Sequence, residues 1–124
     1  MNNLSITIQE RTENFAVRVI KAYSILNENK NFSDPSVVLS KQFLRSGTSI
    51  GANVAEAIYA QSNKDFINKY SIALKEASET KYWIKIMIKS NIANENKFAL
   101  LLKETETIIK ILTAIINKLK GKEN

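Results

Sequence analysis

Apolar residues recur along the chain every three or four positions, and no stretch alternates with a period of two for long. Spacing of this kind predicts helices. We predict four of them, over residues 12–29, 35–60, 63–90 and 94–120. The short connections favour antiparallel neighbours. The pattern therefore predicts an all-α fold, an up-down antiparallel four-helix bundle that forms a single domain over residues 1–124.

Each predicted helix has a row of residues that we expect to face the core. In the last two helices the row advances by alternating steps of four and three, a repeat typical of helices packed at a shallow left-handed angle. The four rows are Phe15, Val19, Ile20, Tyr23 and Leu26; Leu39, Phe43, Gly47, Ile50, Val54 and Ile58; Phe66, Tyr70, Ala73, Ala77, Thr80, Ile84 and Met87; and Phe98, Leu101, Thr105, Ile108, Leu112, Ile115 and Leu119.

Polar residues mark several helix ends. Asp34 precedes Pro35 and can accept a hydrogen bond from a free amide of the second helix. Ser62 and Asp65 have the spacing of a capping box, with Asp in place of the usual Glu or Gln. Asn94 is a candidate cap for the last helix, and Gly121 is a candidate stop.

The chain has more apolar surface than one bundle core needs. Trp83 and Ile86 lie off the core row of the third helix, and Leu102, Ile109 and Ile116 form a second row on the fourth. A helix that is apolar over more than one stripe is buried on more than one side. We therefore predict a homo-oligomer. The alternative is a single wide core stripe with Trp83 half-exposed.

Small residues gather in the second helix. Gly47, Gly51 and Ala55 follow one another at intervals of four and so share one side. A side without bulky groups lets another helix approach closely, within the chain or between subunits. Asn53 and Glu56, three positions apart, can hydrogen-bond each other or a partner helix. The alternative is that the glycines are merely a tolerated weakness of the helix.

Composition removes several kinds of chemistry. The chain has no cysteine and no histidine, which excludes disulfides, thiol nucleophiles and imidazole bases. No signal peptide is evident, and no run of about eighteen apolar residues predicts a membrane span. We expect a cytoplasmic protein that does not enter the membrane.

We expect no catalysis, no cofactor and no metal. Glu76 and Glu79 form a Glu-x-x-Glu pair, but Lys75 and Lys81 flank it, which favours a solvated, salt-bridged face over a metal site. The segment from Gly47 to Gly51 lacks the Gly-Lys-Ser/Thr ending of a phosphate loop.

Positive charge lies in the second half of the chain. Residues 1–63 carry six Lys and Arg against five Asp and Glu, whereas residues 64–124 carry twelve against seven, a net of +5. We predict nucleic-acid contacts from two basic groups. Lys81, Lys85 and Lys89 form a ridge at intervals of four beside Tyr82 and Trp83, whose rings could stack on bases, and Lys118, Lys120 and Lys122 form a basic tail. The alternatives are solvated lysines and a Trp83 that packs at a subunit interface.

The segment QFLRSGTSIGANVAEAIYAQSNKDFINKYSIALKEASETKYWI, residues 42–84, carries a resemblance. Its pairs Leu44–Arg45 and Ser49–Ile50, the run Asn53–Val54–Ala55–Glu56, Phe66 and the run from Ala73 to Glu79 resemble the central signature of the bacterial four helix bundle protein family, also called 23S ribosomal RNA intervening-sequence proteins. That family commonly has proline at the position of Gly51 and glycine at that of Ala57. The Ala57 departure predicts that the second helix continues a turn further in this chain.

The resemblance implies a ring-like homopentamer, in a family with some members encoded within insertions in ribosomal RNA genes. It also implies similarity to the accessory protein of diversity-generating retroelements, a basic pentamer that binds nucleic acid and a reverse transcriptase. We therefore expect an oligomer that binds RNA or DNA. The alternative is a scaffold that holds a protein partner, and a catalytic site assembled from Arg45, Asn53 and Glu56 is the least favoured reading.

Overall fold

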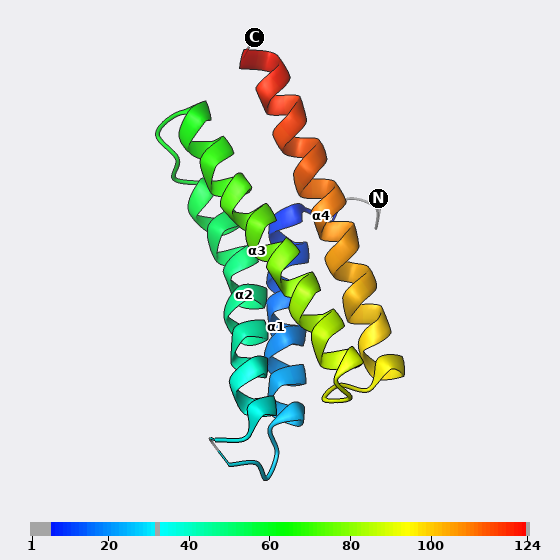
Figure 1. The fold of residues 1–124 in the computed structure, drawn as a ribbon. Helices are drawn as coiled ribbons and strands as arrows, with labels where there is room; N and C mark the ends of the chain where they lie inside the picture. The colour runs from blue at the N-terminus through cyan, green and yellow to red at the C-terminus, as the bar shows by residue number, and fades with distance from the viewer. Residues whose placement is uncertain (1–5, 32, 124) are drawn as a thin grey trace.

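The computed structural model describes residues 6–31 and 33–123, so residues 1–5 and 124 of the predicted domain lie outside the described part. Four helices run alternately up and down: α1 (Ile8–Leu26), α2 (Pro35–Ala57), α3 (Asn63–Lys89) and α4 (Glu95–Glu123) (Figure 1). The described residues contain no strand. The expected all-α four-helix bundle is confirmed.

The bounds of α1 and α2 differ from those expected. Helix α1 begins at Ile8 because the Thr7 hydroxyl accepts a hydrogen bond from the Glu10 amide at 3.1 Å. It ends at Leu26 rather than at residue 29, because the Asn27 side chain donates to the Tyr23 carbonyl. Helix α2 ends at Ala57. The prediction that it extends further was wrong, because residues 58–60 form tight turns in place of helix.

Most predicted caps are present. The Asp34 carboxylate accepts from the Ser36 amide, and the Ser62 hydroxyl accepts from the Asp65 amide. The return bond of the capping box is displaced by one residue, since Asp65 accepts from the Gln61 amide rather than from that of Ser62. The Asn94 side chain accepts from the Lys97 amide. Gly121 does not stop α4, which continues through it to Glu123.

The core contains most of the predicted rows, including Phe15, Val19, Phe43, Ile84 and Leu112. Three positions differ. Ile20 and Ile58 are about half exposed, at 49% and 56%. In α4 the fully packed residue is Ile116 rather than the half-buried Ile115, because an α-helix drifts relative to a strict seven-residue repeat.

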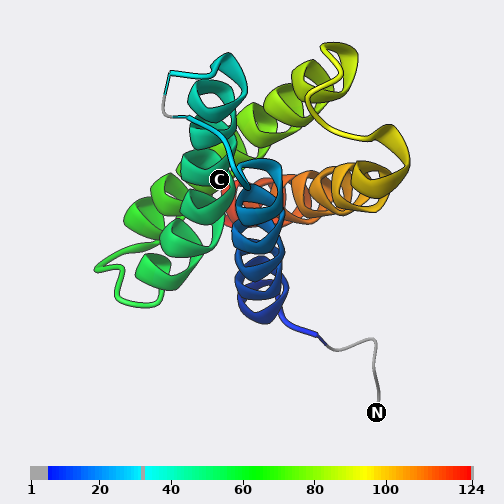
Figure 2. The same ribbon diagram turned by 90° about the horizontal axis from the view of Figure 1, so that it is seen from below.

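The helices pack in chain order, with the largest contact between α2 and α3 and the smallest between α1 and α4 (Figure 2). Helices α1 and α2 approach closely where α2 lacks side chains. A Cβ atom at Gly47 would lie 2.8 Å from Cγ2 of Val19, and one at Gly51 would lie 3.1 Å from the backbone oxygen of Thr12. The predicted close helix contact therefore lies within the chain.

The chain reverses direction after α1 and α3 through asparagines. Asn29 and Asn91 have positive φ angles of 58° and 63°, a region that side-chain-bearing residues rarely adopt and that Asn tolerates best. Within the described part of the chain, no helix combines the length and apolar character that crossing a membrane requires.

Candidate nucleic-acid interface

The predicted basic ridge of α3 is divided between two surfaces. Lys81 turns towards α4, and its ammonium group lies 3.3 Å from a carboxylate oxygen of Glu106. Lys85 and Lys89 are exposed and line a groove of about 420 Å³ between α3 and α4, together with Ile88, Glu95 and Leu102. Of the three predicted lysines, only these two offer charge without an ion pair among the described residues.

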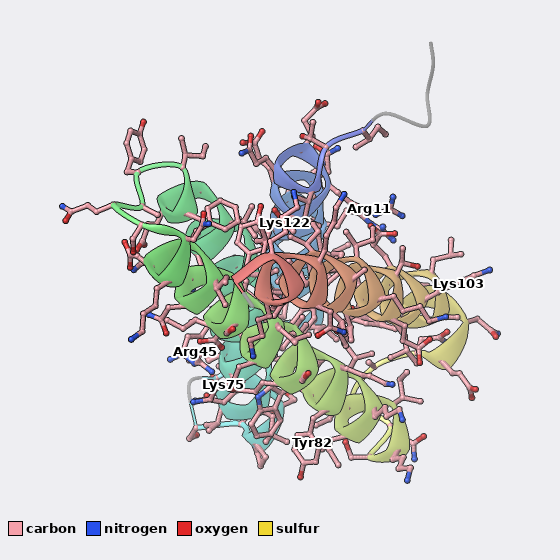
Figure 3. All side chains as sticks on the ribbon, turned by 90° about the horizontal axis from the view of Figure 1, so that it is seen from above. Arg11, Arg45, Lys75, Tyr82, Lys103 and Lys122 are labelled. Atoms are coloured by element: carbon pink, nitrogen blue, oxygen red, sulfur yellow. The ribbon has the colours of Figure 1, made fainter. Side chains whose placement is uncertain are left out.

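The structure extends this surface in the other direction. Lys75, Ser78, Tyr82, Lys85 and Lys89 follow one another at steps of three and four, and all five are exposed. Residues at these steps lie along one side of a helix, and the fourteen positions from the first to the last span about 21 Å. We call these five residues the α3 stripe. It contains no acidic residue, and Figure 3 shows its Tyr82 pointing away from the bundle.

The two aromatic candidates have different environments. Tyr82 is 55% exposed, so its ring is open to solvent. Trp83 is half-buried against the core, and its indole N–H donates to a Glu79 carboxylate oxygen at 3.0 Å. Ile86 is half-buried as well. Tyr82 is therefore the ring that could stack on a base, whereas Trp83 belongs to a packed cluster.

That cluster joins α2 to α3. Arg45 forms ion pairs with Glu76, at 3.3 Å, and with Glu79. The pKa of Glu79 lies below its ordinary value of 4.5, because the Trp83 indole and the Arg45 guanidinium donate hydrogen bonds to the carboxylate. The Glu-x-x-Glu pair is thus held by Arg45, as part of the salt-bridged face that the sequence favoured.

Asn53 and Glu56 do not pair with each other. The Asn53 amide donates to the Ser49 carbonyl of its own helix at 2.9 Å. Glu56 binds Lys69 of α3 at 2.8 Å, with 59% of its side chain exposed. The idea of a buried Asn–Glu pair was wrong, because the position of Glu56 near the end of α2 leaves its carboxylate open to water. Arg45, Asn53 and Glu56 have separate partners and form no common site.

Helix α2 also borders an open groove on the α1 side. Ala55 is exposed and lines this groove of about 380 Å³ with Gly51, Ala52, Ala16 and Glu13. The small residues therefore have two environments, since Gly47 and Gly51 contact α1 directly and Ala55 leaves the surface shallow. No group of three or more acidic side chains in the described part of the chain is placed to hold a metal ion.

The C-terminal lysines form part of a helix and not a tail. Lys118, Lys120 and Lys122 are all exposed on α4. Positions 118 and 122 share one side of the helix, whereas position 120 points to the other. Figure 3 shows Lys122 at the projecting end of α4. Lys120 and Lys122 lie in the last turn, where positive charge also stabilises the helix through its dipole.

A second basic surface was missed in the sequence. Arg18 and Lys21 of α1 and Lys97 of α4 line a groove of about 270 Å³ between the two helices. The two sides of this groove are far apart in the chain, so no spacing rule could bring them together. The only available signal was the pairing of α1 with α4 that an up-down bundle implies.

Residues 5–114 match the 23S rRNA-intervening sequence protein family. The chain belongs to this family. It is also similar to a crystal structure of a protein of unknown function from the S23 ribosomal protein family of Bacteroides thetaiotaomicron. The two chains are 44% identical, the match covers 89% of this chain and 98% of the other, and the TM-score is 0.80. No match is found among curated proteins. The family resemblance carried by residues 42–84 is confirmed.

Proposed function

We propose that this member of the 23S rRNA-intervening sequence protein family is a non-enzymatic, cytoplasmic homo-oligomer that binds the backbone of RNA or DNA without reading its sequence. The observation that carries the proposal is the α3 stripe, in which three lysines and an exposed tyrosine share one side of a helix without an acidic residue. Cations contact phosphates and an open ring stacks on bases, which is the combination used by proteins that bind single strands.

Oligomerisation would multiply this surface. The family resemblance suggests a pentamer, and five copies of a chain with a net charge of +6 carry +30. Support for assembly comes from exposed apolar residues on α1 and α2, among them Val17, Ile20, Val38 and Ile58. Weak contacts from each subunit then sum to a useful affinity with steep salt dependence.

The test is a light-scattering mass on a sizing column, with and without a short structured RNA at low salt. We expect a species near five times the 14.0 kDa chain mass that becomes heavier with RNA and returns to its first mass at high salt. An assembly of this mass that ignores RNA contradicts nucleic-acid binding and leaves the protein-scaffold alternative. A monomer contradicts the oligomer.

Charge reversal locates the contact. In the variant Lys75→Glu/Lys85→Glu/Lys89→Glu, we expect RNA affinity to be lost and the slope of log affinity against log salt to fall by about 2, or roughly 0.7 for each single-strand phosphate contact. The matched control is Lys118→Glu/Lys120→Glu/Lys122→Glu, which changes the net charge equally. An equal loss in both variants would mean that total charge, and not the α3 stripe, determines binding.

A further inference from the structure

The groove between α1 and α4 has a charged rim and an apolar floor. Arg18 and Lys21 stand on the α1 side and Lys97 on the α4 side. All three are exposed, and none has a hydrogen bond or ion pair among the residues that the structure describes. The residues lining this groove include no acid. Its rim therefore presents three free positive charges across a single opening.

The floor is aliphatic rather than aromatic. Ile25 is 65% exposed, and Ala22 and Leu101 complete the surface beside it. The one ring, Phe98, is only 7% exposed and packs edge-on against Phe43, with ring centroids 6.2 Å apart. It therefore has no free face on which a nucleobase could stack.

One end of the groove is held in place. Arg11 binds both carboxylate oxygens of Glu104, at 2.7 and 3.0 Å, and so links α1 to α4 two turns before Arg18 reaches the groove. Two-point pairing of this kind fixes the geometry of both partners. The groove is thus largely formed before any ligand arrives, which lowers the free-energy cost of binding.

We infer that this groove docks a short acidic amphipathic segment of another protein, such as one helical turn or two with apolar anchors flanked by Asp or Glu. The floor from Arg18 to Ile25 runs along about 10 Å of α1, which matches the distance between anchors at i and i+7 of a bound helix. The anchors would bury against Ile25 and Leu101, and the acids would meet the three cations.

Charge and shape favour this occupant over two others. Nucleic acid would satisfy the cations but would find no stacking surface, and so would leave Ile25 in water. A second copy of the chain carries a net charge of +6, and one of its most exposed apolar regions, around Tyr59, lies next to a glutamate already bound to Lys69. The inference does not depend on nucleic-acid binding by the α3 stripe.

The experiment begins with selection from a random twelve-residue peptide library displayed on phage, with the full-length protein as bait. We expect the selected peptides to share two or more Asp or Glu around a pair of apolar residues three or four positions apart. A fluorescein-labelled peptide of that consensus is then titrated by fluorescence anisotropy. Failure to enrich any consensus, or a consensus without acids, would overturn the inference.

Variants assign the peptide to the groove. We expect Arg18→Glu/Lys21→Glu/Lys97→Glu to weaken peptide binding at least about tenfold, and Ile25→Asp to do the same by placing an acid on the floor. These side chains are exposed, so we expect helix content and oligomer mass to stay unchanged. The matched control, Lys75→Glu/Lys85→Glu/Lys89→Glu, makes the same change in charge and should alter peptide affinity by no more than about twofold.

Two further results would overturn the inference. If a twelve-nucleotide uridine oligomer displaces the peptide at a concentration below the peptide's own dissociation constant, the groove is a nucleic-acid site. If the groove variant changes the oligomer mass, the groove is a contact between subunits. Loss of RNA binding in the α3-stripe variant with peptide binding intact would leave both proposals standing and separate.

Discussion

Replacing Gly47 with alanine tests the closest contact in the bundle. The new Cβ would lie 2.8 and 2.9 Å from the two γ-carbons of Val19, which is fully buried and, being β-branched, has little freedom to rotate away. Overpacking of this kind costs about 1–3 kcal/mol, whereas alanine gains about 1 kcal/mol over glycine in a helix. We therefore expect a net destabilisation of up to about 2 kcal/mol.

The assay is urea unfolding followed by circular dichroism, with every variant at one protein concentration because assembly and unfolding are linked. Gly121→Ala is the matched control, since that helical position has no neighbouring atom within 4 Å of the added carbon. We expect Gly47→Ala to be about 1–3 kcal/mol less stable than the control. Equal stability of the two variants would refute the close-contact argument.

A double variant isolates the overlap itself. Val19→Ala removes both γ-carbons that the new Cβ would meet. Val19→Ala and Gly47→Ala together should therefore destabilise less than the sum of the two single changes, by about 1–3 kcal/mol. Effects that add to within about 0.5 kcal/mol would show that α1 and α2 shift apart without strain.

Two other predictions concern the α2–α3 contact. The Thr80 hydroxyl donates to the Ser46 hydroxyl at 2.9 Å in the core, so Thr80→Val should cost about 1–3 kcal/mol in chemical denaturation, and adding Ser46→Ala should recover part of it; a double variant no more stable than Thr80→Val would contradict the hydrogen-bond account. The lowered pKa of Glu79 means that its carboxylate, held by Trp83 and Arg45, stabilises the folded chain above pH 4.5 and loses that contribution as the pH falls through the lowered value. Glu79→Gln should therefore lower the melting temperature at pH 7 and have less effect near pH 3, and an equal effect at both would contradict the pairing.

The sequence predicted the elements of the fold because apolar periodicity is local information. Asp34, Ser62 and Asn94 mark helix starts through side chains that satisfy nearby amides, and all three do so in the structure. Helix ends were predicted less well. Gly121 continues the helix because glycine permits a stop but does not impose one, and nothing packs against it there.

The candidate interface was only partly predictable, because exposure depends on neighbouring helices. Lys81, Lys85 and Lys89 look equivalent at intervals of four, but Lys81 turns towards the acidic Glu106 of α4. The exposed side of α3 instead follows steps of three and four and passes through Lys75. The groove between α1 and α4 depends on tertiary contacts and could not be predicted from spacing.

The positive φ angles of Asn29 and Asn91 and the position of Gly47 have an evolutionary consequence. At the two reversals, a mutation from asparagine to glycine keeps the required backbone angle, so those sites have at least one inexpensive exchange. Gly47 has none, since every other residue brings a Cβ into Val19. Over long divergence, a lineage could remodel its lysines and change its ligand while this one position resists replacement, so natural selection on the fold would be most visible where the chain has no side chain at all.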